Sequence, residues 1–324
     1  MRVLKALYIG ETSGVHDLRF LEAIKEKFEV DACFTSDLTN FESIEFEIYD
    51  LIVAAPLIGT ISVIPKNLNI PIVGISLAYD VNSESLSSDL RVNIQRCKLI
   101  VCDCKYVEDK IIKEHSFDQK KISVIPFGCD LDLFQPELQK KYSEPNILVT
   151  RNWFPTHSNK IVIEALQLLH DQGIDFNCTF VGNGPELQET IEKVSNSSMN
   201  SKIFFVGSKS PRDIQKLMNE SNFYVSASRS DGSSVSLMEA LATGLICIVS
   251  DFPSNREWVD HQKSGFLFQN ESAKSLSKTI REVLEIKPEV LTSISHLGIE
   301  VAKTKANWRK NRVDFIRVLE SAIE

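Results

Sequence analysis

Long apolar runs, a leader-like segment and clustered cysteines are all missing from this sequence of 324 residues. No stretch of about 18 apolar residues occurs, so we expect no membrane-spanning helix. The first residues carry one short apolar run without a small-residue cleavage site, and we expect no signal peptide. The seven cysteines are scattered, and the one close pair, Cys102 and Cys104, is a weak metal signal. These absences favour a reduced, cytoplasmic protein, with contact to the inner face of a membrane left open.

An excess of positive charge is also missing. The chain has 36 Lys and Arg against 44 Asp and Glu, for a net charge of −8. Residues 1–136 hold 14 of the basic and 21 of the acidic residues, which leaves 22 against 23 for the remainder. An acidic first half argues against binding to bare nucleic acid, because such binding depends on cationic side chains that neutralise phosphates. A smaller basic patch that contacts phosphate or a membrane surface remains compatible with these numbers.

What the sequence does have is a regular alternation of short apolar runs with helical stretches. Such runs suit strands that are buried on both faces of a parallel sheet. The alternation pauses in a proline-containing segment at 121–146 and then restarts. We therefore predict an α/β protein with two doubly wound, Rossmann-like domains, at 1–136 and 137–300. Residues 296–324 read as continuous helix, and we expect 301–324 to cross back to the first domain.

One stretch of the second half, "SASRSDGSSVSLMEALATG" at 226–244, carries the clearest functional signal. An apolar strand runs into an Asp-Gly-Ser-Ser turn, and a helix is predicted to begin near Ser234. The first turn of a helix presents unpaired N–H groups and a positive dipole end, which suit a phosphate, and Gly232 permits close approach of backbone. Asp231 and Glu239 are too far apart for a shared proton, so they would hold different parts of one ligand. A simple capped helix with a solvent-facing Glu239 is the alternative.

The surrounding residues resemble the retaining glycosyltransferases of family 4, also described as glycosyl transferases group 1. Members typically carry Ser, then Glu-Gly-Phe-Gly, then Glu-Ala-Met-Ala-x-Gly, a buried strand and a loop with Glu. The matching pieces are "SRSDGSSVSLMEALATG" and "SDFPSNREWVDHQKSGFLF", and the likeness extends to "VIPFGCDLDLFQP", "VGNGPELQE" and "IFFVGSKSPRDI". The resemblance implies the GT-B fold, in which two doubly wound domains face each other across a cleft.

The resemblance also implies roles for residues of the second half. Glu239 matches the Glu that accepts hydrogen bonds from the ribose hydroxyls of a sugar nucleotide. Asp231 matches the first Glu of an E-x7-E pair, beside the donor sugar, with a side chain one methylene shorter. Gly232, Ser233 and Ser234 would offer N–H groups to the diphosphate. A further loop of Gly207, Ser208 and Lys209 would run beside the base.

Cations for the diphosphate follow the first strand of the second half. Arg151 matches the family Arg that meets the diphosphate, and a surface ion pair is the alternative. The family usually places a Lys a few residues later, and this sequence has none there. We expect His157 or Lys160 to replace it, because the leaving nucleoside diphosphate develops negative charge as the glycosidic bond breaks.

The first half contributes weaker signals. Gly14 and His16 follow the first strand, where the resemblance places the diphosphate and the acceptor, although His16 also fits a plain helix start. Asp80 follows another strand, in a place where related members have a polar loop. The "DLD" at 130–132 resembles a metal motif but lies in the interdomain segment, so we predict no metal.

The resemblance implies a retaining transferase that uses a nucleotide-diphosphate sugar, UDP-sugar or GDP-sugar, as its co-substrate and needs no cofactor. Asp231, Arg151 and His16 are its expected catalytic groups, and a glycan, glycolipid or small molecule is the expected acceptor. Polysaccharide, lipopolysaccharide or glycoconjugate biosynthesis is the expected setting. Two alternatives remain open at this point, a nucleotide-sugar 2-epimerase and a non-catalytic partner that binds nucleotide sugars.

Overall fold

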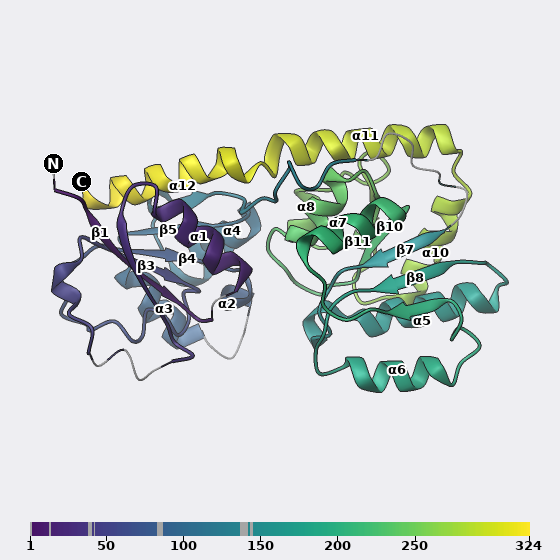
Figure 1. Cartoon of the computed structure of the whole chain (residues 1–324), viewed down its shortest axis with the longest axis horizontal. Helices are drawn as coiled ribbons and strands as arrows, with labels where there is room; N and C mark the ends of the chain where they lie inside the picture. Colours follow the sequence, from purple (N-terminus) through teal and green to yellow (C-terminus); the bar gives the residue numbers. More distant parts are fainter. Residues whose placement is uncertain are drawn as a thin grey trace. The chain divides into compact units, whose positions relative to one another are not determined.

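The structure, a computed structural model, describes residues 2–12, 14–37, 41, 43–82, 87–136, 142 and 145–324. The chain divides into two compact units (Figure 1). Unit 1 comprises residues 1–127 and 308–324, and unit 2 comprises residues 128–307. The boundary expected after residue 136 therefore falls inside unit 2, which begins at residue 128.

Unit 1 contains a six-stranded sheet in the order β2-β1-β3-β4-β5-β6, and every pair of neighbours is parallel. Its strands are β1 (Lys5–Gly10), β2 (Glu29–Phe34), β3 (Leu51–Ala55), β4 (Ile72–Ile75), β5 (Leu99–Cys102) and β6 (Ile122–Val124). Its helices are α1 (Val15–Ile24), α2 (Tyr79–Asn82), α3 (Ser87–Arg96), α4 (Lys105–His115) and α12 (Trp308–Ile323). The apolar runs that predicted strands are fully buried in β3 and β4, as strands between two helical layers must be.

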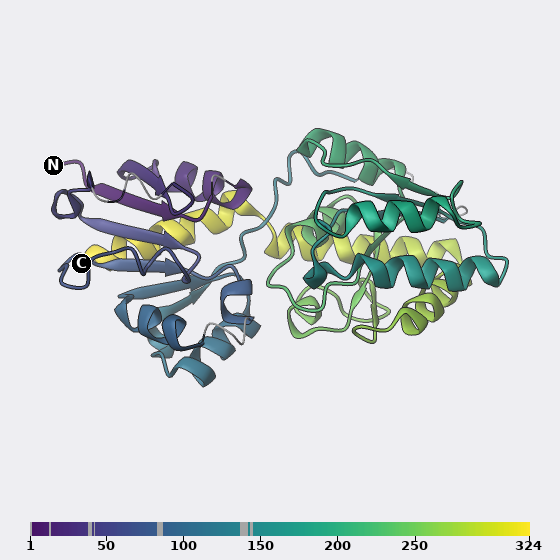
Figure 2. The same cartoon turned by 90° about the horizontal axis from the view of Figure 1, so that it is seen from below.

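Helices cover both faces of this sheet. On one face α1 and α12 bury Phe20, Phe315 and Leu319 against the strands. On the other face α3 and α4 bury Ile94 and Ile111. Figure 2, turned by 90°, shows α12 in yellow along the sheet of unit 1.

Unit 2 repeats the architecture with a six-stranded parallel sheet in the order β12-β11-β10-β7-β8-β9. Its strands are β7 (Asn146–Val149), β8 (Asn177–Phe180), β9 (Ile203–Phe205), β10 (Phe223–Ser226), β11 (Ile246–Ser250) and β12 (Phe266–Phe268). Its helices are α5 (Asn159–Asp171), α6 (Leu187–Ser195), α7 (Pro211–Glu220), α8 (Val235–Ala242), α9 (Pro253–Arg256), α10 (Ala273–Leu284) and α11 (Pro288–Lys305). Apolar faces of α5 and α10 pack on one side of the sheet, and those of α7, α8 and α11 pack on the other.

The continuous helix expected over 296–324 is wrong in one respect, because the chain forms two helices there. The first, α11, ends at Lys305, and α12 begins at Trp308. Between them the Cys129 N–H donates to the Ala306 carbonyl oxygen (2.9 Å), and Cys129 forms a parallel bridge with Asn307. A backbone that pairs as a strand cannot also continue the helical ladder, so the helix stops at this point.

Candidate functional site

The two central strands of unit 2, β7 and β10, lie side by side but lead in opposite directions. From β7 the chain continues to β8 and β9 on one side, and from β10 it continues to β11 and β12 on the other. Such a switch point opens a crevice at the carboxyl ends of the two strands, where ligands of doubly wound sheets bind. The loops after β7 and β10 carry six of the residues that the sequence singled out, Arg151, His157, Asp231, Gly232, Ser233 and Ser234.

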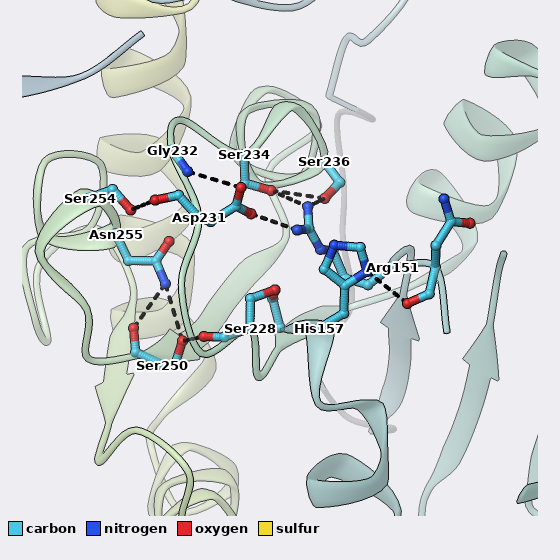
Figure 3. A network of polar contacts seen from close by, with 12 residues as sticks. Arg151, His157, Ser228, Asp231, Gly232, Ser234, Ser236, Ser250, Ser254 and Asn255 are labelled. Carbon is cyan, nitrogen blue, oxygen red and sulfur yellow. Dashed lines mark hydrogen bonds and ion pairs between the residues drawn. The ribbon is translucent and has the colours of Figure 1, made fainter. Parts of the chain in front are cut away.

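Arg151 and Asp231 meet at this switch point (Figure 3). Arg151 Nη2 lies 2.5 Å from Asp231 Oδ2, and Nη1 donates to the Ser234 hydroxyl (2.8 Å) and the Ser236 hydroxyl (3.4 Å). The Arg151 side chain is 12% exposed and that of Asp231 is 25% exposed, so the pair is partly shielded from water. The structure therefore brings together two residues that are 80 positions apart in the sequence.

The Asp231 carboxylate is engaged on both of its oxygens. Its Oδ1 accepts from the N–H of Gly232 (2.9 Å), while Oδ2 pairs with Arg151. The backbone oxygen of Asp231 accepts from the Ser254 hydroxyl (3.0 Å), which ties the loop to α9. Behind it, the Ser250 hydroxyl donates to the Ser228 carbonyl oxygen (2.6 Å). These bonds hold the loop from both sides, as Figure 3 shows.

Helix α8 starts next to the ion pair. Ser234 is its N-cap residue, and the Ser234 side chain makes no capping bond but accepts from Arg151. Ser233 is buried, and its hydroxyl accepts from Trp258 Nε1 (3.1 Å). The first turn of a helix has N–H groups without intrahelical acceptors, so this helix start adds donors beside the guanidinium.

Glu239 is half-buried in the second turn of α8. It lies about 7.5 Å further along the helix axis than Ser234, at the usual rise per residue. A ligand that spans both positions must be extended along the helix.

His157 belongs to a short 3-10 turn, Pro155–His157, that follows Arg151. Its Nδ1 lies 2.8 Å from the Asn152 carbonyl oxygen, which can only accept, so Nδ1 carries a proton and Nε2 is the other functional atom. Burial, and then the nearby Arg151 guanidinium, hold the pKa of His157 below its ordinary value. Arg229 fixes the turn, since its backbone N–H donates to Thr156 O (2.9 Å).

Lys160 forms ion pairs with two glutamates. Its ammonium lies 3.1 Å from Glu186 Oε1 and 3.0 Å from Glu189 Oε2, at the start of α6. Of the two residues expected to replace the missing lysine, the structure therefore brings His157, and not Lys160, close to Arg151.

Two glycine-containing loops support this arrangement from the side. Gly184 has a φ of +153°, and a Cβ placed there would lie 2.6 Å from the Trp153 carbonyl oxygen. The Gly182 N–H donates to Gly207 O (3.0 Å), and Asn183 Nδ2 donates to the Ser208 hydroxyl (3.0 Å). The sequence indicated a tight turn at "VGNG", but it did not show that the turn packs against the segment after Arg151. Lys209 is exposed.

In unit 1 the candidate residues lie beyond the carboxyl ends of strands. There they contact other groups of the same unit. The Gly14 N–H donates to Asp17 Oδ2 (3.1 Å) and to Thr12 O (2.8 Å). The His16 ring packs edge-on to Phe127, with 5.9 Å between centroids.

Asp80 is fully buried, and it accepts from Leu57 N (2.9 Å) and from the Ser76 hydroxyl (2.7 Å). The sequence missed a second buried carboxylate, Asp17, which accepts from the Tyr8 hydroxyl (2.8 Å). Its place in the first turn of α1 was the available signal.

The arrangement in unit 2 can bind an anion. It combines a guanidinium, an imidazole, several hydroxyls and a helix start. Across the described ranges, no group of three or more His, Cys, Asp or Glu side chains could hold a metal ion. Asp130 of the "DLD" segment accepts from the N–H of Asp132 (3.0 Å) within its own turn. None of the helices that the structure describes is long and apolar enough to cross a membrane.

Most of unit 2 matches a known protein family. The family model of glycosyl transferases group 1 matches residues 132–296, just over half of the chain. The chain is 30% identical over 200 residues to the UDP-Gal:alpha-D-GlcNAc-diphosphoundecaprenol alpha-1,3-galactosyltransferase of Escherichia coli, covering 57% of this chain and 51% of that protein. It is 24% identical over 179 residues to the amylovoran biosynthesis glycosyltransferase AmsK of Erwinia amylovora, covering 53% and 44%. The chain thus spans about half the length of the curated relatives it matches.

Solved structures match over nearly the whole chain. HepE of Anabaena, solved with UDP and glucose, has a TM-score of 0.81 at 16% identity, covering 98% of this chain and 100% of that one. Sucrose-phosphate synthase of Thermosynechococcus elongatus has a TM-score of 0.80 at 16% identity, covering 99% of each chain. At this identity the likeness concerns the fold. The chain belongs to the glycosyl transferases group 1 family and has the GT-B fold.

Proposed function

We propose that the protein is a retaining glycosyltransferase that moves a sugar from a nucleotide-diphosphate sugar to a hydroxyl acceptor. The observation that carries the proposal is the contact of Arg151 with Asp231 and Ser234 at the start of α8. All three residues lie within the segment that the family model matches. A cation and helix N–H groups at one switch point suit a diphosphate.

We assign the parts of the donor along this edge of unit 2. The diphosphate would lie against Arg151 and the first turn of α8, where Gly232, Ser233 and Ser234 supply N–H groups. The ribose diol would reach Glu239, because a carboxylate accepts from two hydroxyls at once. Asp231 would lie beside the donor sugar, and the loop at 207–209 beside the base. We assign UDP as the nucleotide, since HepE was solved with UDP and UDP-glucose.

Charge stabilisation is the main chemistry that these residues supply. As the bond from the sugar to the diphosphate breaks, negative charge grows on the leaving oxygen, and Arg151 and the N–H groups offset it. The incoming hydroxyl would attack from the face that the diphosphate leaves, and the leaving phosphate would take its proton. This scheme retains the configuration at the anomeric carbon and assigns no step to a metal.

We assign the acceptor to unit 1, with His16 and Gly14 at the end of β1 as its nearest groups. Asp80 would act indirectly, because its carboxylate is buried and holds the loops after β3 and β4. A lipid-linked glycan acceptor, reached by peripheral membrane contact, fits the name of the Escherichia coli relative. Polysaccharide biosynthesis would be the setting.

The test is to incubate the protein with UDP- and GDP-sugars, with and without lipid-linked or simple sugar acceptors. We expect release of nucleoside diphosphate, transfer with the anomeric configuration of the donor, and full activity in a chelator. Interconversion of the nucleotide sugar would identify an epimerase instead. Binding without turnover of any donor would identify a non-catalytic partner, and an inverted product would exclude retention.

Glu239 gives a second test of the donor assignment. Glu239→Gln should weaken UDP affinity about tenfold, the usual size of a lost hydrogen bond to a charged group. The same change should matter much less for 2′-deoxy-UDP, which lacks one of the two hydroxyls. Calorimetric titration of both ligands measures this, and equal losses for both would refute the ribose assignment.

A further inference from the structure

A row of three hydroxyl groups lies behind Arg151. The Tyr224 hydroxyl is 2.8 Å from Ser236 Oγ, and Ser236 Oγ is 3.1 Å from Ser234 Oγ. Ser234 Oγ in turn accepts from Arg151 Nη1 at 2.8 Å. The row therefore connects the core of unit 2 to the guanidinium that we assign to the diphosphate.

The inner end of the row is anchored in the core. Tyr224 lies on β10 and is 0% exposed, and it belongs to the same buried core cluster as Met238, Leu241 and Val249. A phenol at this depth needs a hydrogen-bond partner, and Ser236, in the first turn of α8, supplies one. Burial raises the pKa of Tyr224, so the phenol keeps its proton and stays available as a donor.

Counting protons leaves two possible directions for the row. Arg151 has no acceptor, so the oxygens of Ser234 and Ser236 both accept from its Nη1. Each hydroxyl then has one proton to donate. If Tyr224 donates to Ser236 and Ser236 donates to Ser234, the Ser234 proton is left to point outward. The opposite order would turn the Ser234 proton inward, and an anion in front of Arg151 favours the outward order.

We propose that Tyr224 and Ser236 are positioning residues that hold the Arg151 guanidinium and orient the Ser234 hydroxyl as a donor to a diphosphate oxygen. This inference rests on the proposed donor site, because it assumes that the diphosphate lies against Arg151. It gives a function to a tyrosine that the apolar pattern of β10 marks only as core.

Three variants test the row. Tyr224→Phe removes one oxygen and keeps the ring, Ser236→Ala removes the central hydroxyl, and Ser236→Thr keeps it. We expect the first two to weaken UDP affinity and lower kcat/KM for the donor by about 3- to 10-fold, the effect of one hydrogen bond between neutral groups. Ser236→Thr should retain most of the wild-type affinity. The double variant Tyr224→Phe/Ser236→Ala should be no worse than about the more affected single variant, because the residues act in series.

The controls separate positioning from simple folding effects. Tyr142→Phe removes a phenol that donates to Gly244 O (3.4 Å), and Ser195→Ala removes a hydroxyl that donates to Ile191 O (2.8 Å), both in unit 2. Neither should change UDP affinity. If Tyr224→Phe and Ser236→Ala lower only the melting temperature and leave UDP affinity and kcat/KM unchanged, the inference is overturned.

Arg151→Ala distinguishes failure of the positioning row from failure of the donor site itself. Loss of UDP binding in Arg151→Ala, together with wild-type binding in Tyr224→Phe and Ser236→Ala, would reject the positioning row and keep the donor site. Wild-type UDP binding in Arg151→Ala would reject the donor site itself.

Discussion

The two units use a six-stranded parallel sheet in two chemically different ways. Each has six parallel strands, with a switch point between β1 and β3 in unit 1 and between β10 and β7 in unit 2. At this edge unit 2 presents a guanidinium that is 12% exposed, with hydroxyls around it. Unit 1 instead has buried carboxylates beyond the ends of its strands, among them Asp17 and Asp80, which are 7% and 0% exposed. The strand orders of the two sheets differ, but in both sheets parallel strands end at one edge, and the side chains decide what that edge can bind.

The difference lies in where the hydrogen bonds of the charged groups go. Burial raises the pKa of both Asp17 and Asp80, and the protein supplies donors to each, such as Tyr8 and Ser76. Both carboxylates accept their hydrogen bonds from groups of unit 1. Arg151 keeps part of its surface exposed, so a stronger anion can join or displace its partners. The proposed donor site of unit 2 therefore leaves a cation able to meet ligand charge, whereas Asp17 and Asp80 of unit 1 bond to groups of their own unit.

The largest expected effect concerns the cation of unit 2. Arg151→Ala should weaken UDP binding at least about 100-fold and lower kcat by a comparable factor, as loss of a preorganised charge in an active site does. Calorimetry with UDP and donor turnover measure the change. Arg281→Ala, which removes an exposed arginine of α10 in the same unit, is the matched control and should behave as wild type. If Arg151→Ala bound UDP as well as Arg281→Ala does, Arg151 would not be the cation that binds the ligand, and the contrast between the units would be wrong.

In unit 1, loss of a buried carboxylate should lower stability and leave ligand binding unchanged. Asp80→Ala should lower the free energy of unfolding by about 2 to 3 kcal/mol, because it leaves the Leu57 N–H and the Ser76 hydroxyl buried without their acceptor. Chemical denaturation monitored by circular dichroism measures this loss. UDP affinity should stay at the wild-type value, since the proposed donor site lies in unit 2. A variant as stable as wild type would mean that the carboxylate is not structural.

The sequence predicted the repeated α/β architecture because buried parallel strands leave long apolar runs that one sequence reveals. It also singled out Arg151 and Asp231 separately, but their ion pair needs the order of β7 and β10 in the sheet, which no local pattern contains. Tyr224 and Ser236 were missed for a related reason. A tyrosine in an apolar strand reads as core, and its partner lies across the strand–helix packing. The break at Ala306 likewise depends on a distant residue, Cys129.

A moderate effect is expected when pH changes the charge of His157. Its lowered pKa means that the unfolded chain binds more protons near the ordinary value of about 6.5, so stability rises as pH rises through that range. A bound diphosphate reverses the preference, because it favours the protonated ring. We therefore expect UDP-glucose, whose diphosphate does not titrate there, to bind a few-fold more tightly at about pH 6 than at about pH 8.

Proton uptake provides the measurement for His157. Calorimetry of UDP-glucose binding near neutral pH, in two buffers that differ in ionisation enthalpy, should show a fraction of a proton taken up. His157→Gln should abolish both the uptake and most of the pH dependence. His296→Gln, on the exposed side of α11, is the control that should keep them. Unchanged uptake in His157→Gln would show that the imidazole does not face the diphosphate.

The smallest effect separates the two residues that were expected to replace the family lysine. Lys160 is held by Glu186 and Glu189, so its charge is already offset before any ligand binds. Lys160→Ala should change UDP affinity by less than about twofold, since exposed ion pairs contribute little and are screened by salt. Titration at low and at moderate ionic strength checks this. If Lys160→Ala weakened binding as much as His157→Gln, the lysine would have to leave both carboxylates when the donor binds, and the cationic edge of unit 2 would extend along α5.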